Sequence, residues 1–406
     1  MKTFTGTQYL MIDAANHYGL DKVPFEARLS FIERSLPNLE QMVPSAKDKV
    51  RFAKAVIAIR DAQAGNPSGH LVGLDASCSG IQLMSVLTGC YLGAAATSLV
   101  DPDQPMDAYS LTTHAMNEHL TADVEVSRDQ AKDAVMTSFY GSEAKPRDIF
   151  GANSPQLAAF YKAVEAVAPG PWKLRNELLR AWDPSTKMHQ WNLPDGFHAR
   201  IKVVSRENKS IKVDELDGKS FTYQFVTNEP QAEGISLPAN VIHSIDAYVV
   251  RFMERACHYD QQVHRDATTA LIAYYNHKTA KGFPCQNLKA AIDRYEKTKM
   301  PDLAILPYLT PDNVAWLPKG LADKLADMLS VMANYEPFPL ITIHDEFAAH
   351  PNNLNVVRMW YKRILAMLAD ADLLTAIFND LGMKGYYQKE TLNLSSYIMK
   401  SNYAIS

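Results

Sequence analysis

The chain has 406 residues, 47% of them hydrophobic, so it can bury a sizeable core, and its length suggests two or three subdomains. A formal net charge of −4 excludes a protein that is basic as a whole, so charge alone does not indicate nucleic-acid binding. The most apolar stretch, residues 71–100, contains an aspartate and many small polar residues, so no membrane span is predicted. The four cysteines form no CxxC or zinc-site spacing, which is typical of reduced thiols in a cytoplasm.

The first part of the chain is predicted to be helical up to a single strand. Apolar side chains recur at helical spacing after Pro24, so residues 1–60 are expected to be largely helical. The Gly- and Pro-containing segment 65–70 breaks this pattern. The short apolar run 71–74 then predicts a buried strand that leads into Asp75.

Helices are also predicted over 80–92, 105–120 and 127–140. The third has the clearest ends, because Ser127 is a suitable N-cap and Gly141 follows the last apolar position.

The second half of the chain begins with an alternating pattern. Residues 197–228 predict a β-hairpin with Asp217 and Gly218 as its turn. A helix is predicted over 240–258, and residues 260–334 are expected to be mostly helical with breaks at prolines.

A second buried strand is predicted over 338–343, before an amphipathic helix from about 353 to 370. Asp345 follows this strand as Asp75 follows the first, so the two carboxylates can approach each other across a sheet. Paired carboxylates suit Mg²⁺, a hard cation that prefers oxygen ligands, and nucleotidyl transfer uses two such ions. The alternative is that each aspartate is a turn or helix-cap residue.

The predicted helix 127–140 places several functional side chains on one face. Arg128, Lys132 and Met136 are spaced by four residues, and Tyr140 follows on the same side. Two cations suit a triphosphate, and a tyrosine offers a ring and a hydroxyl beside a sugar. The alternative is a solvated face with Met136 and Tyr140 packed inward. Gly141 is either a C-cap or a position that lets a template base approach closely.

Three blocks resemble motifs A, B and C of the single-subunit DNA-directed RNA polymerases of phages and mitochondria. They are DASCSGIQ at 75–82, RDQAKDAVMTSFYGS at 128–142 and IHDEF at 343–347, and their order is that of the family. The similarity continues at 19–33, 192–197, 240–248 and 392–406, whereas 256–322 is the least matched stretch. Seven blocks in the family's order make the resemblance specific.

The resemblance implies a role for each matched residue. Two Mg²⁺ ions would be held by Asp75, Asp345 and the carbonyl of Ala76, with His344 beside them. The incoming ribonucleoside triphosphate would be contacted by Lys22, Arg128 and Lys132, and Tyr140 would lie by the ribose. Catalytic roles are expected for Asp75, Asp345, Lys132, Tyr140 and His344, and the substrate pocket would also include Gly80, Met136, Gly141 and His243. For Lys22 and His243, an ordinary solvated or packed side chain is the alternative.

The choice of sugar depends on two positions. Family A DNA polymerases share the Arg-x₃-Lys helix and have the HDE triplet found here. They carry a glutamate where this chain has Gly80 and an aromatic residue where it has Met136. An open pocket beside the sugar favours RNA synthesis. A DNA polymerase of that kind and a catalytically silent nucleic-acid-binding subunit are the alternatives.

The resemblance implies a helix-rich α+β right-hand polymerase fold made of palm and fingers. The expected divisions are a palm part with motif A at 1–100, fingers at 101–190, a specificity-loop-like hairpin at 191–236, a helical region with a lineage-specific insertion at 237–336, a palm part with motif C at 337–385 and a C-terminal foot at 386–406.

The family's thumb and N-terminal promoter-binding region precede the block that begins here near residue 19, so both are expected to be absent from this chain. The sequence resembles the larger polypeptide of the split, two-subunit RNA polymerases of Enquatrovirus-type coliphages. The expected partners are a DNA template, an RNA transcript, a second polymerase subunit and an auxiliary DNA-binding or strand-opening factor. The expected location is the cytoplasm of an infected bacterium, with no membrane involvement.

Overall fold

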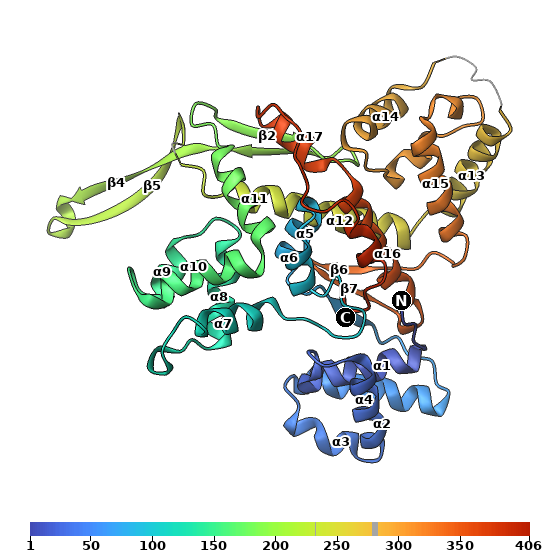
Figure 1. Cartoon of the computed structure of the whole chain (residues 1–406), viewed down its shortest axis with the longest axis horizontal. Coiled ribbons are helices and arrows are strands. Elements are labelled where there is room, and N and C mark those ends of the chain that lie inside the picture. The colour runs from blue at the N-terminus through green and yellow to red at the C-terminus, as the bar shows by residue number, and fades with distance from the viewer. Residues whose placement is uncertain (232, 278–282) are drawn as a thin grey trace.

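The computed structural model describes residues 1–231, 233–277 and 283–406 and shows a helix-rich α+β protein (Figure 1). Residues 232 and 278–282, which belong to the expected hairpin and helical divisions, lie outside the described residues. Within the described ranges, none of the helices is both long and apolar enough to cross a membrane.

The N-terminal helices form a layer of their own below the rest of the chain in Figure 1. Helical periodicity predicted them correctly. Their bounds are α1 (Gly6–Ala15), α2 (Phe25–Ser35), α3 (Leu39–Met42) and α4 (Lys49–Ala64).

A small antiparallel sheet combines one strand from the first part of the chain with two strands from near its end. Its strands are β1 (Val72–Asp75), β7 (Glu346–Ala349) and β6 (Ile341–Ile343), in the order β1-β7-β6. Because Asp75 pairs with Glu346 and Gly73 with Ala348, these four positions share one face of the sheet. The opposite face carries the buried side chains of Val72, Leu74 and Phe347 and belongs to the hydrophobic core.

The strand predicted over 338–343 is shorter and less buried than expected. Strand β6 forms an edge of the sheet, and the side chains of Ile341 and Ile343 are 48% and 57% exposed. An apolar run of this length does not distinguish a central strand from an edge strand. Strand β7, which pairs with both β1 and β6, was not predicted, because its four residues begin inside the acidic triplet.

The helices between the first strand and the hairpin pack mainly against one another. They are α5 (Ser79–Thr88), α6 (Tyr91–Ala96), α7 (Ala108–Asn117), α8 (Arg128–Ser138), α9 (Ala144–Phe150), α10 (Pro155–Val167) and α11 (Pro169–Arg180). The single helix predicted over 80–92 is therefore divided into α5 and α6, with Gly89 at the break. Helix α8 begins as predicted, because Ser127 accepts from the backbone N–H of Gln130 and forms a capping box with it.

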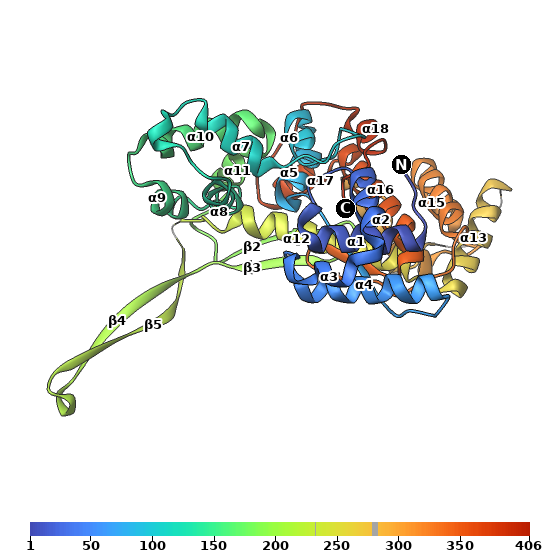
Figure 2. The same cartoon turned by 90° about the horizontal axis from the view of Figure 1, so that it is seen from below.

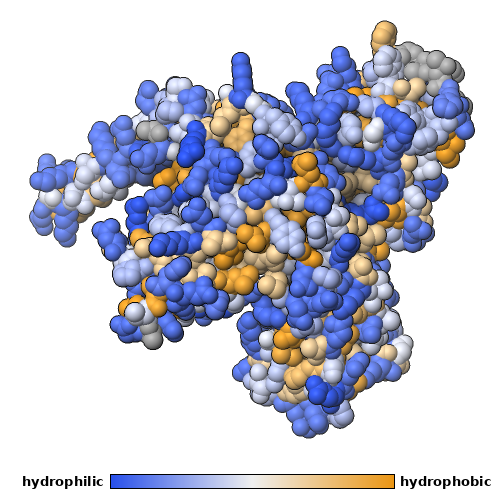
Figure 3. Space-filling model, in the orientation of Figure 1, coloured by the Kyte–Doolittle hydropathy of each residue, from blue (hydrophilic) through white to orange (hydrophobic). Residues whose placement is uncertain are grey.

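The predicted hairpin is present, but its first strand pairs differently. Residues 198–202 form β3, which pairs with β2 (Met188–Asn192), whereas the long hairpin consists of β4 (Val204–Val213) and β5 (Lys219–Pro230). Asp217 and Gly218 form its turn as predicted, both with positive φ. The hairpin projects far from the body (Figure 2) and is mostly hydrophilic on the face shown in Figure 3, where larger hydrophobic areas lie on the body.

The remaining helices complete the core. They are α12 (Leu237–Cys257), α13 (Gln261–Tyr275), α14 (Gln286–Thr298), α15 (Lys319–Met332), α16 (Leu354–Asp370), α17 (Leu373–Asp380) and α18 (Leu394–Ile398). Helices α5, α12 and α16 pack against one another, as the burial of Ile81, Ile245 and Ile364 shows. Helices α12 and α16 match the predicted helices 240–258 and 353–370.

A buried arginine on α16 joins the two ends of the chain. The Arg358 guanidinium donates to the carbonyls of Lys2 and Asn402, at 2.9 and 2.8 Å, and to the Tyr9 hydroxyl at 3.0 Å. The C-terminal residues then reach the sheet, where Ile405 forms a bridge with Ala76 and the Ser406 N–H donates to the carbonyl of Asp75. Arg358 thereby supports the segment that lies against the end of β1.

Replacing Arg358 by Met is expected to lower the free energy of unfolding by about 3 kcal/mol, because buried acceptors lose a charged donor. Arg363→Met on the same helix is the control: Arg363 bonds the exposed Asp327 at 2.6 Å, and such a pair contributes ~0–1 kcal/mol. Urea denaturation monitored by circular dichroism measures both. Equal losses in the two variants would contradict the role given to Arg358.

Candidate active site

The end of β1 and the turn between β6 and β7 bring the two predicted metal-binding aspartates together. Asp75 is the last residue of β1, and Asp345 lies in the turn after His344, whose φ is +56°. The N–H of Ala76 donates to the carbonyl of Asp345 at 3.3 Å, which joins the two segments directly. Residues distant in sequence thus meet at one end of the sheet.

Most of the predicted site residues line one cavity of about 910 Å³. Ten of them lie on its wall: Lys22, Asp75, Ala76, Gly80, Lys132, Met136, Tyr140, His243, His344 and Asp345. The other two, Arg128 and Gly141, lie close to it in sequence and space but are not part of the lining. The cavity is bordered by the sheet, by α5 and α8, and by α12.

Negative charges are crowded at the sheet end of this cavity. Although solvent reaches Asp75 from the cavity, burial of its carboxyl and the charges of Glu346 and Asp345 raise its pKa to about 6. Burial, and then the charge of Asp345, also raise the pKa of Asp246 on α12 to about 6. Carboxylates that repel one another in this way favour a bound cation. Asp246 lines the cavity; it lies within the matched block 240–248, but the sequence analysis gave it no role.

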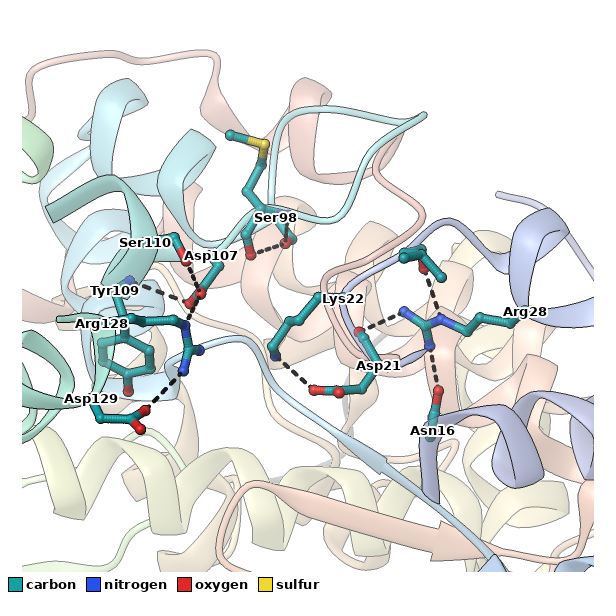
Figure 4. A network of polar contacts seen from close by, with 12 residues as sticks. Asn16, Asp21, Lys22, Arg28, Ser98, Asp107, Tyr109, Ser110, Arg128 and Asp129 are labelled. Carbon is teal, nitrogen blue, oxygen red and sulfur yellow. Dashed lines mark hydrogen bonds and ion pairs between the residues drawn. The ribbon is translucent and has the colours of Figure 1, made fainter. Parts of the chain in front are cut away.

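The cations of helix α8 contact the start of α7. The Arg128 Nε donates to Asp107 at 2.6 Å, beside the Tyr109 ring (Figure 4). The centroid of that ring lies 5.6 Å from the Arg128 guanidinium and 5.9 Å from the Lys132 ammonium. Asp107 also accepts from Ser110 and caps α7. Both residues lie in the helix predicted over 105–120, but neither belongs to a matched block, and the sequence analysis gave them no role at the site.

The position of Lys22 is set by the buried Arg28 on α2. Arg28 donates to the carbonyls of Val23 and Asp21, at 2.8 and 2.9 Å, and to the Asn16 side chain at 2.8 Å. These bonds fix the loop on both sides of Lys22, whose ammonium lies 3.2 Å from the Asp21 carboxylate (Figure 4). Lys22 is therefore held at the rim of the cavity, opposite α8.

Tyr140 occupies the space that Gly80 leaves open. A Cβ atom on Gly80 would lie 2.3 Å from the Tyr140 hydroxyl and 2.8 Å from its Cζ, so a side chain there would displace the ring. The Tyr140 ring also lies 4.8 Å from the His243 ring, between centroids. The pocket predicted to be open beside Gly80 is therefore occupied by this hydroxyl. Burial raises the pKa of Tyr140, so the hydroxyl keeps its proton at neutral pH.

Gly141 has a close backbone neighbour of its own. Its φ is +104°, and a Cβ atom would lie 2.4 Å from the carbonyl oxygen of Ile235, just before α12. A glycine is therefore needed for the turn after α8 to pack against this segment.

Oxygen atoms dominate the donor set around Asp75. The carboxylates of Asp75 and Asp345 and the nearby backbone oxygens suit Mg²⁺, which proteins often bind through one or two carboxylates plus substrate phosphates. In the part of the chain that the structure describes, no group of three or more His, Cys, Asp or Glu side chains is arranged to hold a metal by itself. The residues present fit a metal ion whose remaining ligands come from the substrate.

Comparison with known proteins gives consistent matches. Residues 3–146 match the protein family described as DNA-dependent RNA polymerase, a range that includes the first two motif blocks. The chain is 27% identical over 313 residues to the DNA-directed RNA polymerase of Pseudomonas phage phiKMV, over 62% of this chain and 38% of that protein. It is 31% identical over 130 residues to T7 RNA polymerase of Escherichia phage T7, over 29% of this chain and 15% of that protein.

A plant organellar enzyme shows the same relationship. The chain is 27% identical over 309 residues to DNA-directed RNA polymerase 2, chloroplastic/mitochondrial, of Arabidopsis thaliana, over 62% of this chain and 30% of that protein. The chain thus spans less than two fifths of the length of each of these three relatives. Phage and organellar matches agree, and this chain is similar to the DNA-directed RNA polymerases of phages and plant organelles.

Proposed function

We propose that this chain is the catalytic part of a DNA-directed RNA polymerase that adds ribonucleotides to an RNA 3′ end. The observation that carries the proposal is the convergence of Asp75, Asp345, Lys132 and Tyr140 on one cavity, from the end of β1, the turn between β6 and β7, and α8 with the residues just after it. Kinship with RNA polymerases supports the same activity. Extension of an RNA primer on a DNA template, with ribonucleotides and deoxyribonucleotides in parallel, tests it.

Two Mg²⁺ ions bound at Asp75 and Asp345, with the carbonyl of Ala76 as a further ligand, would activate the 3′-hydroxyl and neutralise the leaving pyrophosphate. The 3′-oxygen forms a bond to the α-phosphorus as the bond to pyrophosphate breaks. Lys132 faces the cavity and would contact the triphosphate from α8, with Arg128 beside it and Lys22 opposite. His344 adjoins Asp345 and would help to shape the metal site.

In this proposal, Tyr140 reads the ribose. Its hydroxyl keeps its proton, and it fills the space beside Gly80 where a bulkier residue would exclude it. Met136 and His243 line the same cavity, and His243 would touch the newest base pair. A hydroxyl at this point can recognise the sugar 2′-hydroxyl.

Replacing Tyr140 by Phe is expected to keep most activity but to relax the discrimination against deoxyribonucleotides by roughly two- to tenfold, the value of one hydrogen bond of ~0.5–1.5 kcal/mol. The ring, and hence its contact with His243, is retained. The measurement is the ratio of kcat/KM for a ribonucleotide and its deoxy counterpart. An unchanged ratio would mean that Tyr140 is only a packing residue.

The proposal extends to the division of the fold and to its partners. The sheet and the helices packed on it would be the palm, helices α7–α11 the fingers, and the hairpin β4–β5 a promoter-contacting loop. A polar two-stranded ribbon of this kind fits the major groove, and Arg206 and Lys209 lie on it. A second polypeptide and an auxiliary DNA-opening factor would complete the enzyme, which would act in the cytoplasm of an infected bacterium.

A further inference from the structure

The Tyr140 hydroxyl makes no hydrogen bond with any of the described residues, although it occupies the space beside Gly80. The Tyr140 ring contacts the His243 ring, with the two centroids 4.8 Å apart. The hydroxyl is therefore free to bond a ligand. The place of this side chain depends on how the backbone on either side of residue 140 is held.

A buried arginine on the neighbouring helix α11 holds that backbone. Arg175 is 5% exposed. Its Nε donates to the carbonyl of Ser138 at 3.2 Å, and its Nη2 donates to the carbonyl of Gly141 at 3.3 Å. Ser138 is the last residue of α8, and Gly141 directly follows Tyr140. One guanidinium thus bridges the turn that carries the tyrosine.

The turn needs such a donor because a helix ends there. The last carbonyls of an α-helix have no partner within the helix, and a cation is favourable at this end of the helix dipole. The Gly141 N–H also donates to the Ser138 carbonyl, at 3.0 Å, but among the described residues the Gly141 carbonyl accepts only from Arg175. Arginine carries its N–H groups in a rigid planar fork that can bond two carbonyls at once, whereas lysine has a single ammonium.

Arg175 is itself held in place. Its guanidinium carbon lies 4.8 Å from the centroid of the Trp172 ring on the same helix, and its Nη1 donates to the Asn176 side chain at 2.8 Å. The Trp172 ring packs edge-on against Phe139, the residue before Tyr140. Stacking on this ring and hydrogen bonds from both Nη atoms leave the guanidinium little freedom to move.

Helix α11 also packs against α5, the helix that carries Gly80. Near the start of α11, a Cβ atom on Gly170 would lie 2.5 Å from the Cβ of Cys90, which lies between α5 and α6. One helix therefore contacts both sides of the pocket: it packs on the helix of Gly80, and its Arg175 holds the turn of Tyr140. A shift of that turn would move the tyrosine hydroxyl relative to Gly80.

We propose that Arg175 is a positioning residue for sugar selection: it holds the turn after α8 so that the Tyr140 hydroxyl meets the 2′-hydroxyl of a nucleoside triphosphate. The inference rests on the proposed function, in which Tyr140 reads the ribose. Arg175 does not line the active-site cavity, so its effect reaches the sugar only through the turn. A hydrogen bond weakens steeply with distance and angle, so a small displacement of the hydroxyl removes it.

The affinities of ATP and dATP for the full chain on a primed template test the inference, in Ca²⁺ so that no turnover is needed. Arg175→Lys keeps the charge without the fork, and Arg175→Met removes every donor. Both are expected to lower the preference for ATP roughly two- to tenfold, the loss expected for Tyr140→Phe.

Arg147→Met is the matched control. Arg147 bonds Glu143 at 2.8 Å, and Glu143 also lies 3.5 Å from the Arg175 guanidinium, but Arg147 bonds neither carbonyl of the turn. This variant is expected to keep the wild-type preference for ATP.

Combination with Tyr140→Phe separates positioning from a general loss of structure. Once the hydroxyl is absent, Arg175→Lys is expected to cause no further loss of preference, because two residues that act through one group do not have additive effects. An unchanged preference in the Arg175 variants, or an equal further loss in the Tyr140→Phe background, would overturn the inference. Thermal unfolding shows whether each variant is folded, and Arg175→Lys decides the result if Arg175→Met is not.

Primer extension by the same variants in Mg²⁺ distinguishes this inference from the proposed function. Extension by the wild type with a ribonucleotide preference that neither Arg175 variant changes would overturn the inference alone. A preference for ATP that depends on Arg175, in a chain that never extends the primer, would support the inference and contradict the polymerase. A wild-type chain that binds ATP and dATP equally well would overturn the inference whether or not it extends the primer.

Discussion

Asp75→Asn and Asp345→Asn are each expected to abolish nucleotide addition and to leave the fold and template binding nearly intact. Each substitution removes a metal-binding charge at the point where β1 meets the turn before β7, without removing a core side chain. A bound cation contributes several kcal/mol to the transition state, so a loss of roughly 10³-fold or more in rate is expected. Single-turnover primer extension at saturating Mg²⁺ measures it.

Thermal unfolding without metal provides the control for folding. The pKa of Asp75 in the folded chain, about 6, lies above its ordinary value, so the ionised carboxylate weakens the fold at neutral pH. Stability associated with this group is present below its ordinary pKa and is lost as the pH rises through about 6. Asp75→Asn should therefore be at least as stable as the wild type at pH 7.

A substitution of an exposed acid on α8, Asp133→Asn, serves as the activity control and should leave the rate unchanged. Near-normal extension by Asp75→Asn or Asp345→Asn at physiological Mg²⁺ would contradict the assignment of the two metal ligands.

The second large effect concerns the partner: this chain alone is expected to be a poor polymerase, and a second polypeptide should restore activity. A net charge of −4 gives weak overall attraction to a nucleic-acid backbone. Hydrophobic side chains are also exposed on α4 and β6, namely Val50, Ile57, Ile341 and Ile343. Exposed apolar surface favours docking of another protein and makes the free subunit prone to aggregate.

The comparison is between this chain purified alone and the co-expressed pair, by light scattering, template affinity across salt, and extension rate. Each phosphate contact added by the partner increases the salt slope on duplex DNA by about 0.9, and each 1.4 kcal/mol of added binding energy raises affinity about tenfold. A monodisperse lone chain that transcribes as well as the pair would contradict the two-subunit proposal and leave the assignment of Asp75 and Asp345 untouched.

Local sequence patterns predicted the helices, strands and turns whose ends are marked by capping or turn residues. Helix α8 follows from the Ser127 capping box, and the first strand follows from an apolar run that stops at Asp75. The turn of the hairpin follows from Asp217 and Gly218, which both adopt positive φ. The roles of the matched site residues came from the family resemblance, and the structure places ten of those residues around one cavity.

Features that depend on distant partners were not predictable from local patterns. The alternating pattern assigned residues 198–202 to the long hairpin, but these residues form β3 and pair with β2. Alternation indicates a strand without showing which other strand it pairs with. An apolar run does not show that β6 lies at a sheet edge. Asp107 and Tyr109 reach the site through tertiary packing, and Asp246 lies one helical turn from His243 on α12, but the sequence analysis gave none of the three a role.

Template-directed primer extension tests the central claim most directly. The wild-type chain, alone and with its partner, is given an RNA primer on a DNA template with Mg²⁺ and either ribonucleotides or deoxyribonucleotides. The account predicts extension in the order set by the template, a preference for ribonucleotides, and no extension by Asp345→Asn. Binding of the primed template without extension under any condition, or a preference for deoxyribonucleotides, would contradict it.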